Sequence, residues 1–217
     1  MEASKSEIKS LQGLCILAML CLHLFCRTEY SYSPAILFAG IPLCYFFGQL
    51  ADFCVMGYAF CSAYGHCAIL DKSSNSYYKR RIKSLINLLI VFWSILIVFT
   101  MISICIGNGE NIPGEGYEFL GNILLYKLTY NGAWWYLTTY IFLVLTSKFI
   151  IHFVYRYHWL FVIVISVMIY AGSYYMRFYC PEPFESSILN QIIRQFYLYG
   201  MTAPEYIIGV FFYKYKI

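Results

Sequence analysis

Charged side chains are scarce in this amino-acid sequence. Asp, Glu, Lys and Arg together make up 12% of its 217 residues, about half the share found in soluble domains. Hydrophobic residues account for 61% and aromatic residues for 21%. A chain of this length cannot hide so much apolar surface inside a water-soluble core, because small domains leave much of their surface wet. The composition therefore excludes soluble, disordered and collagen-like proteins, and it predicts a polytopic membrane protein.

Several other patterns are missing as well. The nine cysteines include no C-x-x-C pair, so neither a metal site nor a disulfide framework is indicated, and packing within the spans is their expected role. The net charge of +4 is too small and too dispersed for a nucleic-acid surface. The sequence shows no internal repeat, no low-complexity tract and no separate soluble domain. A cleavable signal peptide is not expected, because no small-residue cleavage site follows the first apolar run.

Long apolar runs recur along the chain. A helix needs about 20 mostly apolar residues to cross the hydrocarbon of a bilayer. The runs predict an all-α fold, a polytopic bundle of transmembrane helices. The apolar runs lie at residues 11–26, 35–70, 85–106, 133–151, 159–175 and about 196–213.

The run at residues 35–70 is long enough for one span or two, and the charges of the chain decide between them. Basic residues collect on the cytoplasmic side of short loops. With one span there, eleven basic residues are cytoplasmic, and those that face outward are only Arg27, Lys127, Arg177 and Arg194. Two spans would place the basic cluster at 79–83 outside. We therefore predict a span at 52–70 after an interfacial or re-entrant piece at 35–49, and six spans in all with both termini cytoplasmic.

His23 is the most informative polar residue, because ionisable side chains within spans are costly and mark a protein interior or a function. It lies late in the first span among apolar neighbours. Neutral imidazole suits proton transfer near neutral pH. Gln12 lies eleven residues earlier, so at about 100° per residue the two side chains share a helix face, about 16 Å apart along the axis. The alternative for His23 is a hydrogen bond to a neighbouring helix.

A basic turn opens the third span. Arg80 and Lys83 are one turn apart on one face, with Arg81 beside them. The cluster is either an anchor for anionic lipid headgroups or a site for phosphate groups that enter from the cytoplasm, since Arg recognises phosphate oxygens through a rigid fork. Ser62 and Tyr64 belong to a stretch of small residues near the cytoplasmic end of the second span, where the backbone can be approached closely.

The remaining polar and aromatic positions are expected to be structural. Asp52 could orient His23, but Asp is a good N-cap and we expect it to cap the second span. Trp135 starts the fourth span, as is typical of an aromatic belt at the membrane surface. Three more histidines lie near interfaces, where we expect them to be solvated or lipid-facing: His66, His152 and His158.

The order of these features resembles the acyltransferase 3 family of integral membrane enzymes, which O-acylate bacterial surface carbohydrates. The family's first span typically reads Arg-Gly-Ile-Ala-Ile with a histidine eleven residues after the arginine, and Gln12-Gly13-Leu14-Cys15-Ile16 followed by His23 is similar. Four later stretches resemble its Ser-Gly-Tyr-Gly, Arg-x-x-Arg, Trp-x-Leu and Pro-x-Phe-x-x-Gly patterns in the same order. They are Ser62-Ala63-Tyr64-Gly65, Tyr77-Tyr78-Lys79-Arg80-Arg81-Ile82-Lys83, Gly132-Ala133-Trp134-Trp135-Tyr136-Leu137 and Pro204-Glu205-Tyr206-Ile207-Ile208-Gly209.

The resemblance implies a function. The protein would transfer an acyl group, expected to be acetyl, from acyl-coenzyme A to a carbohydrate hydroxyl of a cell-surface polysaccharide. It would lie in the inner (plasma) membrane of a bacterium and hold no tightly bound cofactor. His23 would be catalytic, either as a general base on that hydroxyl or in relaying the acyl group. Arg80, Lys83 and Arg81 would bind the donor, and the supporting residues would be Gln12, Ser62, Tyr64 and Trp135.

Some positions depart from the family pattern, and they leave an alternative function open. Gln12 stands where the family usually has Arg, Ala63 replaces a Gly, Lys83 replaces the second Arg, and Tyr140 takes the place of a Glu found in many members. Members usually have about ten spans, so residues 1–217 resemble a single domain whose C-terminal part is missing. The alternative is a non-catalytic polytopic protein, namely a degenerate or truncated relative or a transporter subunit.

The charge distribution predicts that residues 79–83 are cytoplasmic and that residues 107–132 face outward. In a variant whose native cysteines are replaced, a cysteine introduced at Ser74 should react with a membrane-impermeant thiol reagent only after the cells are opened. A cysteine introduced at Asn108 should react in intact cells. Labelling at position 74 in intact cells would show that residues 35–49 cross the membrane.

Overall fold

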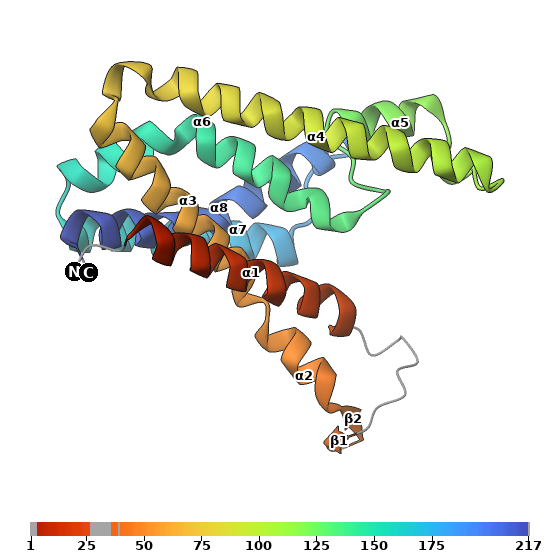
Figure 1. Cartoon of the computed structure of the whole chain (residues 1–217), viewed down its shortest axis with the longest axis horizontal. Coiled ribbons are helices and arrows are strands. Elements are labelled where there is room, and N and C mark those ends of the chain that lie inside the picture. The colour runs from red at the N-terminus through yellow and green to blue at the C-terminus, as the bar shows by residue number, and fades with distance from the viewer. Residues whose placement is uncertain (1–3, 27–35, 39, 217) are drawn as a thin grey trace. The chain divides into compact units, whose positions relative to one another are not determined.

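The computed structural model describes residues 4–26, 36–38 and 40–216, which are almost entirely helical (Figure 1). The α-helices are α1 (Lys5–Phe25), α2 (Leu43–Leu50), α3 (Phe53–Lys72), α4 (Tyr77–Cys105), α5 (Gly116–Ile123), α6 (Trp135–Arg156), α7 (Trp159–Tyr179) and α8 (Ser187–Tyr215). The short 3₁₀ helices η1 and η2 are Ser74–Ser76 and Gly132–Trp134. The strands β1 (Leu37–Phe38) and β2 (Ile41–Pro42) form a small hairpin. The all-α prediction is confirmed.

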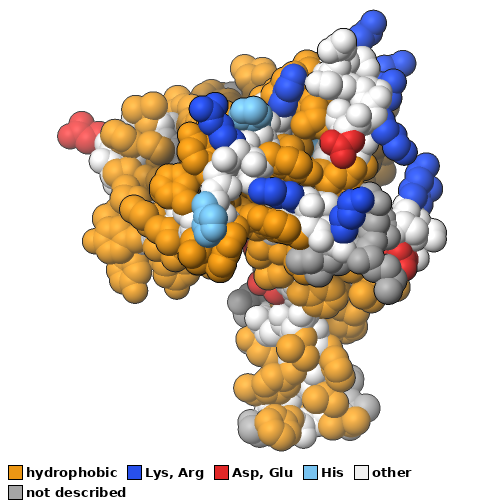
Figure 2. All heavy atoms as spheres, turned by 90° about the vertical axis from the view of Figure 1, so that its left-hand side faces the viewer, with side chains coloured by type: hydrophobic (Ala, Val, Ile, Leu, Met, Phe, Trp, Pro, Cys, Tyr) orange, Lys and Arg blue, Asp and Glu red, His pale blue; other side chains and the backbone are white. Residues whose placement is uncertain are grey.

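Several helical segments are long and apolar enough to cross a membrane. They are Lys5–Phe25, Leu43–Lys72, Ser74–Cys105, Gly132–Arg156 and Trp159–Tyr179. These segments contain five of the six predicted spans. The sixth lies in α8, where polar residues such as Glu205 lower the hydropathy, so its crossing stays a prediction. Hydrophobic side chains occupy much of the surface in Figure 2, and together with the long apolar helices they define a multi-pass membrane protein.

The chain forms two compact units. Unit 1 consists of Met1–Ala68 and Glu205–Ile217, and unit 2 consists of Ile69–Pro204. Helices α3 and α8 therefore each contribute residues to both units. The boundary within α8 falls at Pro204, which lies inside the helix and lacks the N–H group that would continue the backbone ladder.

In unit 1, α1 begins with a capping box. The Ser4 hydroxyl oxygen accepts a hydrogen bond from the Glu7 N–H at 3.2 Å, and the Ser4 N–H donates to the Glu7 carboxylate at 2.6 Å. These bonds satisfy two backbone donors that the first turn leaves open. The helix consequently starts six residues before the apolar run predicted at 11–26.

Residues 36–50 form a hairpin and a short helix. The strands are antiparallel, with Leu37 opposite Pro42 and Phe38 opposite Ile41. Helix α2 follows, and its eight residues extend only about 12 Å, well short of the hydrocarbon thickness of about 30 Å. The Gln49 side-chain N–H donates to the Cys26 carbonyl oxygen at 3.1 Å, which attaches α2 to the end of α1. This segment agrees with a single span in the region; Arg27 and Ala35 lie outside the described residues.

Small residues form the contact between α1 and α3 in unit 1. A Cβ atom at Gly57 would collide with the Cys15 sulfur, and the core around it consists of Cys15, Ala18, Ala51 and Cys54. All nine cysteines are free thiols, and the buried ones agree with the packing role predicted for them. Asp52 directly precedes α3, which is the position of a cap, although a cap by its side chain stays a prediction.

The last part of α8 packs closely on α3, also within unit 1. A Cβ atom at Gly209 would lie 2.5 Å from the Phe60 carbonyl oxygen and 2.8 Å from the Ala63 Cβ. On either side of this contact the Phe60 ring meets Phe212 edge to face at 5.2 Å, and the Tyr64 ring meets Tyr213 at 5.0 Å. The absence of a side chain at Gly209 therefore sets the helix separation.

Unit 2 is built around α4 and α6. Near the start of α4, the buried Tyr77 hydroxyl donates to the Ser147 hydroxyl of α6 at 2.5 Å. In the middle of α4, the Phe92 ring meets the Trp134 ring edge to face at 4.9 Å. The connection between them contains α5, where the buried Asn122 amide donates to the Thr129 hydroxyl at 2.8 Å. The Tyr77 and Phe92 contacts attach the start and the middle of α4 to α6 and η2.

Replacing Gly209 by Ala should destabilise unit 1 by about 1–3 kcal/mol, the usual cost of an added methyl group in a filled contact. The control is Gly13→Ala in α1, because a Cβ atom at Gly13 would meet nothing within 4 Å. Thermal unfolding midpoints of the purified variants in detergent would compare the two. A Gly209→Ala midpoint equal to that of Gly13→Ala would contradict the close contact.

Candidate functional site

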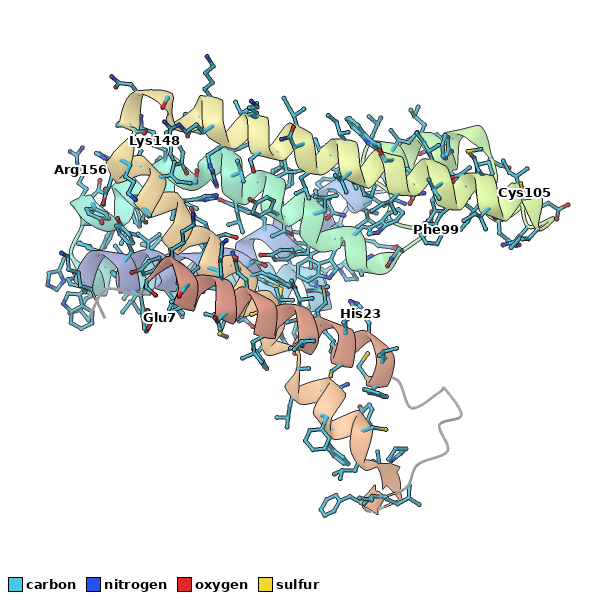
Figure 3. The ribbon with its side chains drawn as sticks, viewed as in Figure 1. Glu7, His23, Phe99, Cys105, Lys148 and Arg156 are labelled. Carbon is cyan, nitrogen blue, oxygen red and sulfur yellow. The ribbon has the colours of Figure 1, made fainter. Side chains whose placement is uncertain are left out.

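The candidate catalytic residue, His23, lies in the last turn of α1 (Figure 3). His23 and Gln12 are both exposed, whereas Cys15 and Ala18 are the buried residues of this helix. The shared face predicted for Gln12 and His23 therefore points away from the core between α1 and α3. The imidazole is exposed on this face.

Two of the predicted supporting residues lie on α3, in the same unit as His23. The Ser62 hydroxyl donates to the Tyr58 carbonyl oxygen of its own helix at 2.7 Å. Tyr64 is buried, and its ring packs against Tyr213. Both side chains thus have structural contacts within unit 1.

His66 corrects one expectation. It was expected to be solvated or lipid-facing, but it is only 1% exposed, and a hydrogen bond of 2.7 Å joins its Nδ1 to the Tyr206 hydroxyl. The sequence did contain a signal, because Ala59, Ala63, His66 and Cys67 recur at helical spacing on one face. The other two histidines are exposed. His158 also caps α7, since its Nδ1 accepts from the Leu160 N–H at 3.3 Å.

The basic turn of α4 divides between two faces. Arg80 and Lys83 are exposed, whereas Arg81 is half-buried. Among the described residues the Arg81 Nε is buried without a hydrogen-bond acceptor, and the Arg81 charge acts on the Tyr140 hydroxyl of α6. Arg81 is therefore the member of the cluster that points into unit 2.

Basic residues gather at one end of unit 2. Figure 3 shows Lys148 and Arg156 of α6 at the end opposite Phe99 and Cys105 of α4. A cavity of about 540 Å³ lies at the basic end. Its polar lining residues are Asp71, Ser74, Tyr78, Lys148, His152 and Tyr155.

Trp135, the last predicted supporting residue, opens α6 and is half-buried, with its ring edge to face on Tyr136 at 5.7 Å. The candidate site residues thus fall into two groups, one in each unit. Unit 1 holds Gln12, His23, Ser62 and Tyr64, and unit 2 holds Arg80, Arg81, Lys83 and Trp135.

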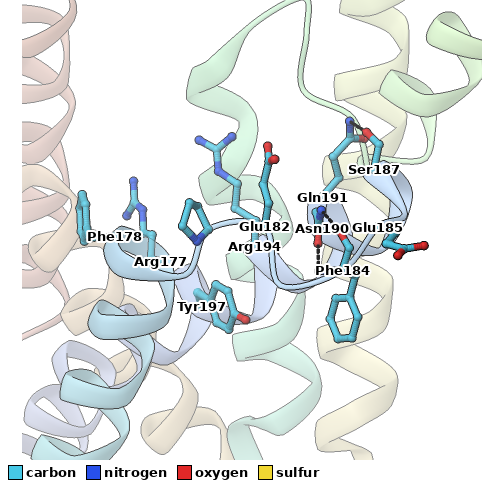
Figure 4. Close-up of a pocket in the computed structure, with 11 residues that line it drawn as sticks. Arg177, Phe178, Glu182, Phe184, Glu185, Ser187, Asn190, Gln191, Arg194 and Tyr197 are labelled. Carbon is cyan, nitrogen blue, oxygen red and sulfur yellow. Dashed lines mark hydrogen bonds between the residues drawn. The ribbon is translucent and has the colours of Figure 1, made fainter.

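A second, larger cavity of about 680 Å³ lies in unit 2 where α7 ends and α8 begins (Figure 4). Arg177, Gln191 and Arg194 contribute polar groups to it. In the sequence the two arginines were distinguished only as outward-facing charges. Their convergence was not visible, because they lie seventeen positions apart on separate helices.

The arrangement defines a multi-pass helical membrane protein with an accessible histidine in one unit and an inward-turned arginine in the other. Comparison with known families adds that the model of the acyltransferase 3 family, described as an acyltransferase domain, matches residues 5–217. The chain belongs to this family of membrane acyltransferases, as the resemblance indicated. No curated protein and no solved structure matches the chain.

Proposed function

We propose that the protein is an O-acyltransferase that moves an acyl group, acetyl by the family resemblance, from acyl-coenzyme A to a hydroxyl of a cell-surface carbohydrate. The family match over residues 5–217 carries this proposal, because it includes both the His23 helix and the basic turn of α4. In the reaction the acceptor oxygen attacks the thioester carbonyl carbon. The carbon–sulfur bond breaks, an ester forms, and coenzyme A leaves as the thiol.

His23 acts as the general base of this reaction. Its neutral imidazole removes the proton from the acceptor hydroxyl as the oxygen attacks, and the proton then passes to the departing sulfur. The exposed position of His23 on α1 supports this role, since a base must come within hydrogen-bond reach of the hydroxyl it activates.

The basic end of unit 2 binds the donor from the cytoplasm. Acyl-coenzyme A carries several phosphate groups, and a guanidinium binds two phosphate oxygens at once. In the part of the chain that the structure describes, no acceptor bonds the Arg81 Nε, while Arg80 and Lys83 extend the positive charge to the exposed surface. The neighbouring cavity, with Lys148 in its wall, offers space for the nucleotide part.

Replacing His23 by Ala should lower the rate of acyl transfer by about 10²–10⁴-fold, the usual contribution of a general base. The measurement is the O-acetyl content of polysaccharide in a strain whose acetylation depends on this protein, at equal membrane abundance. His158→Asn is the matched control, because Asn preserves the cap of α7. Unchanged acetylation in His23→Ala would refute the assignment of this role to His23.

Replacing Arg81 by Lys should raise the KM for acyl-coenzyme A by about tenfold, because Lys keeps the charge but loses the two-point fork. The same change is expected for Arg80→Lys, and the two variants together show which guanidinium contacts phosphate. KM would be measured in membranes with normal insertion of each variant. If KM and turnover are unaltered in both variants, the cluster is a topological anchor.

A further inference from the structure

Two arginines from different helices face the cavity between α7 and α8. Arg177 lies in the last turn of α7 and Arg194 in α8, and their positive charges act on each other. Within the described ranges neither guanidinium forms an ion pair, and Arg177 donates only to the weakly accepting Met201 sulfur at 3.7 Å. Neighbouring like charges repel, so an anion between the two arginines would be stabilised there.

Gln191 of α8 lines the same cavity, and its side chain includes a hydrogen-bond acceptor that is not satisfied within the described residues. Its side-chain N–H donates to the Ser187 hydroxyl at 3.5 Å. Its Oε1 is buried and has no hydrogen-bond donor in the part of the chain that the structure describes. A buried acceptor without a donor is unfavourable, and an occupant with hydroxyl groups would satisfy this oxygen.

The rest of the lining suits a sugar better than a small inorganic anion. Glu182 offers carboxylate oxygens that accept from hydroxyl groups, and in Figure 4 its carboxylate and the Arg194 guanidinium extend to the same side of the connection. Tyr197 and Phe178 add aromatic surface, which packs well against the apolar face of a sugar ring. A volume of about 680 Å³ lies within the usual range of small-ligand pockets.

We propose that this cavity binds an acidic sugar residue, one that carries a carboxylate or a phosphate, as part of the acceptor. Arg177 and Arg194 hold the anionic group through charge-assisted hydrogen bonds, and Gln191 and Glu182 hold its hydroxyl groups. The inference rests on the proposed function, because it names the acceptor class of the transferase. The predicted outward position of Arg177 and Arg194 places the cavity on the side where surface carbohydrates are found.

The test measures binding by calorimetry with the full chain in nanodiscs of a zwitterionic lipid. The probes are tetragalacturonate, which carries carboxylates, pentamannose phosphate, which carries a phosphate, and the neutral maltotetraose. We expect at least one acidic probe to bind at least tenfold tighter than maltotetraose. Arg177→Gln and Arg194→Gln should each weaken acidic binding by about tenfold. Arg156→Gln, which removes the same charge from the basic end of unit 2, should leave it unchanged.

Equal affinity for acidic and neutral probes, or an acidic preference that survives both arginine substitutions, would overturn the proposal. The proposal is also overturned if the two substitutions reduce only the amount of phosphatidylglycerol that the protein retains and leave the binding of the acidic probes unchanged. That result would assign the arginines to lipid headgroups. Arg194 is exposed, so Arg194→Gln carries the test if Arg177→Gln does not fold. Binding is measured without acyl transfer, so a protein that binds the acidic probes but transfers nothing refutes the proposed function and leaves this site in place.

Discussion

Inside a bilayer no water is available to the backbone, so every N–H and C=O group there must find its partner within the chain. Helices meet this requirement locally, and the other features of the structure follow from it. Lipid does not drive apolar helices together as water does, so their contacts depend on close packing of small residues. Gly57 against Cys15 and Gly209 against Phe60 are such contacts. The polar side chains that remain in or near the helices are consequently few, and each one carries structural or functional meaning.

The same constraint explains which parts of the fold the sequence could predict. Apolar runs identified α1, α3, α4, α6 and α7, because the hydrocarbon selects for hydropathy. The helix ends were less predictable. A helix can continue into polar turns, and a hydropathy pattern does not detect those turns. Helix α1 starts at its capping box, and α8 begins at Ser187, well before the apolar run at about 196. Charge placement predicted one span within 35–70, and the short α2 agrees with that interpretation.

The sequence predicted which residue types form the candidate site, but it predicted less well which way their side chains point. Spacing along one helix placed Gln12 and His23 on a shared face, yet which face is covered depends on the neighbouring helix. For that reason His66 was expected to be exposed and proved to be buried against Tyr206. In the basic turn, one residue step of about 100° separates the exposed Arg80 from the half-buried Arg81. That Arg177 and Arg194 line the same cavity could be seen only in the tertiary structure, because no local sequence pattern links them.

Unit 2 places guanidinium groups at two ends that differ in their surroundings. At the basic end Arg81 lies near Tyr140, where many family members have Glu, so no carboxylate at this position competes with a phosphate for the guanidinium. At the other end Arg177 and Arg194 share an open cavity. Helix α7 connects the two ends, and its 21 residues extend about 31 Å. In the proposed reaction the thioester of the donor would therefore have to reach along the bundle toward an acceptor on the outer side. The charge rule assigns the His23 end of α1 to that outer side, where a base acting on the acceptor hydroxyl is needed.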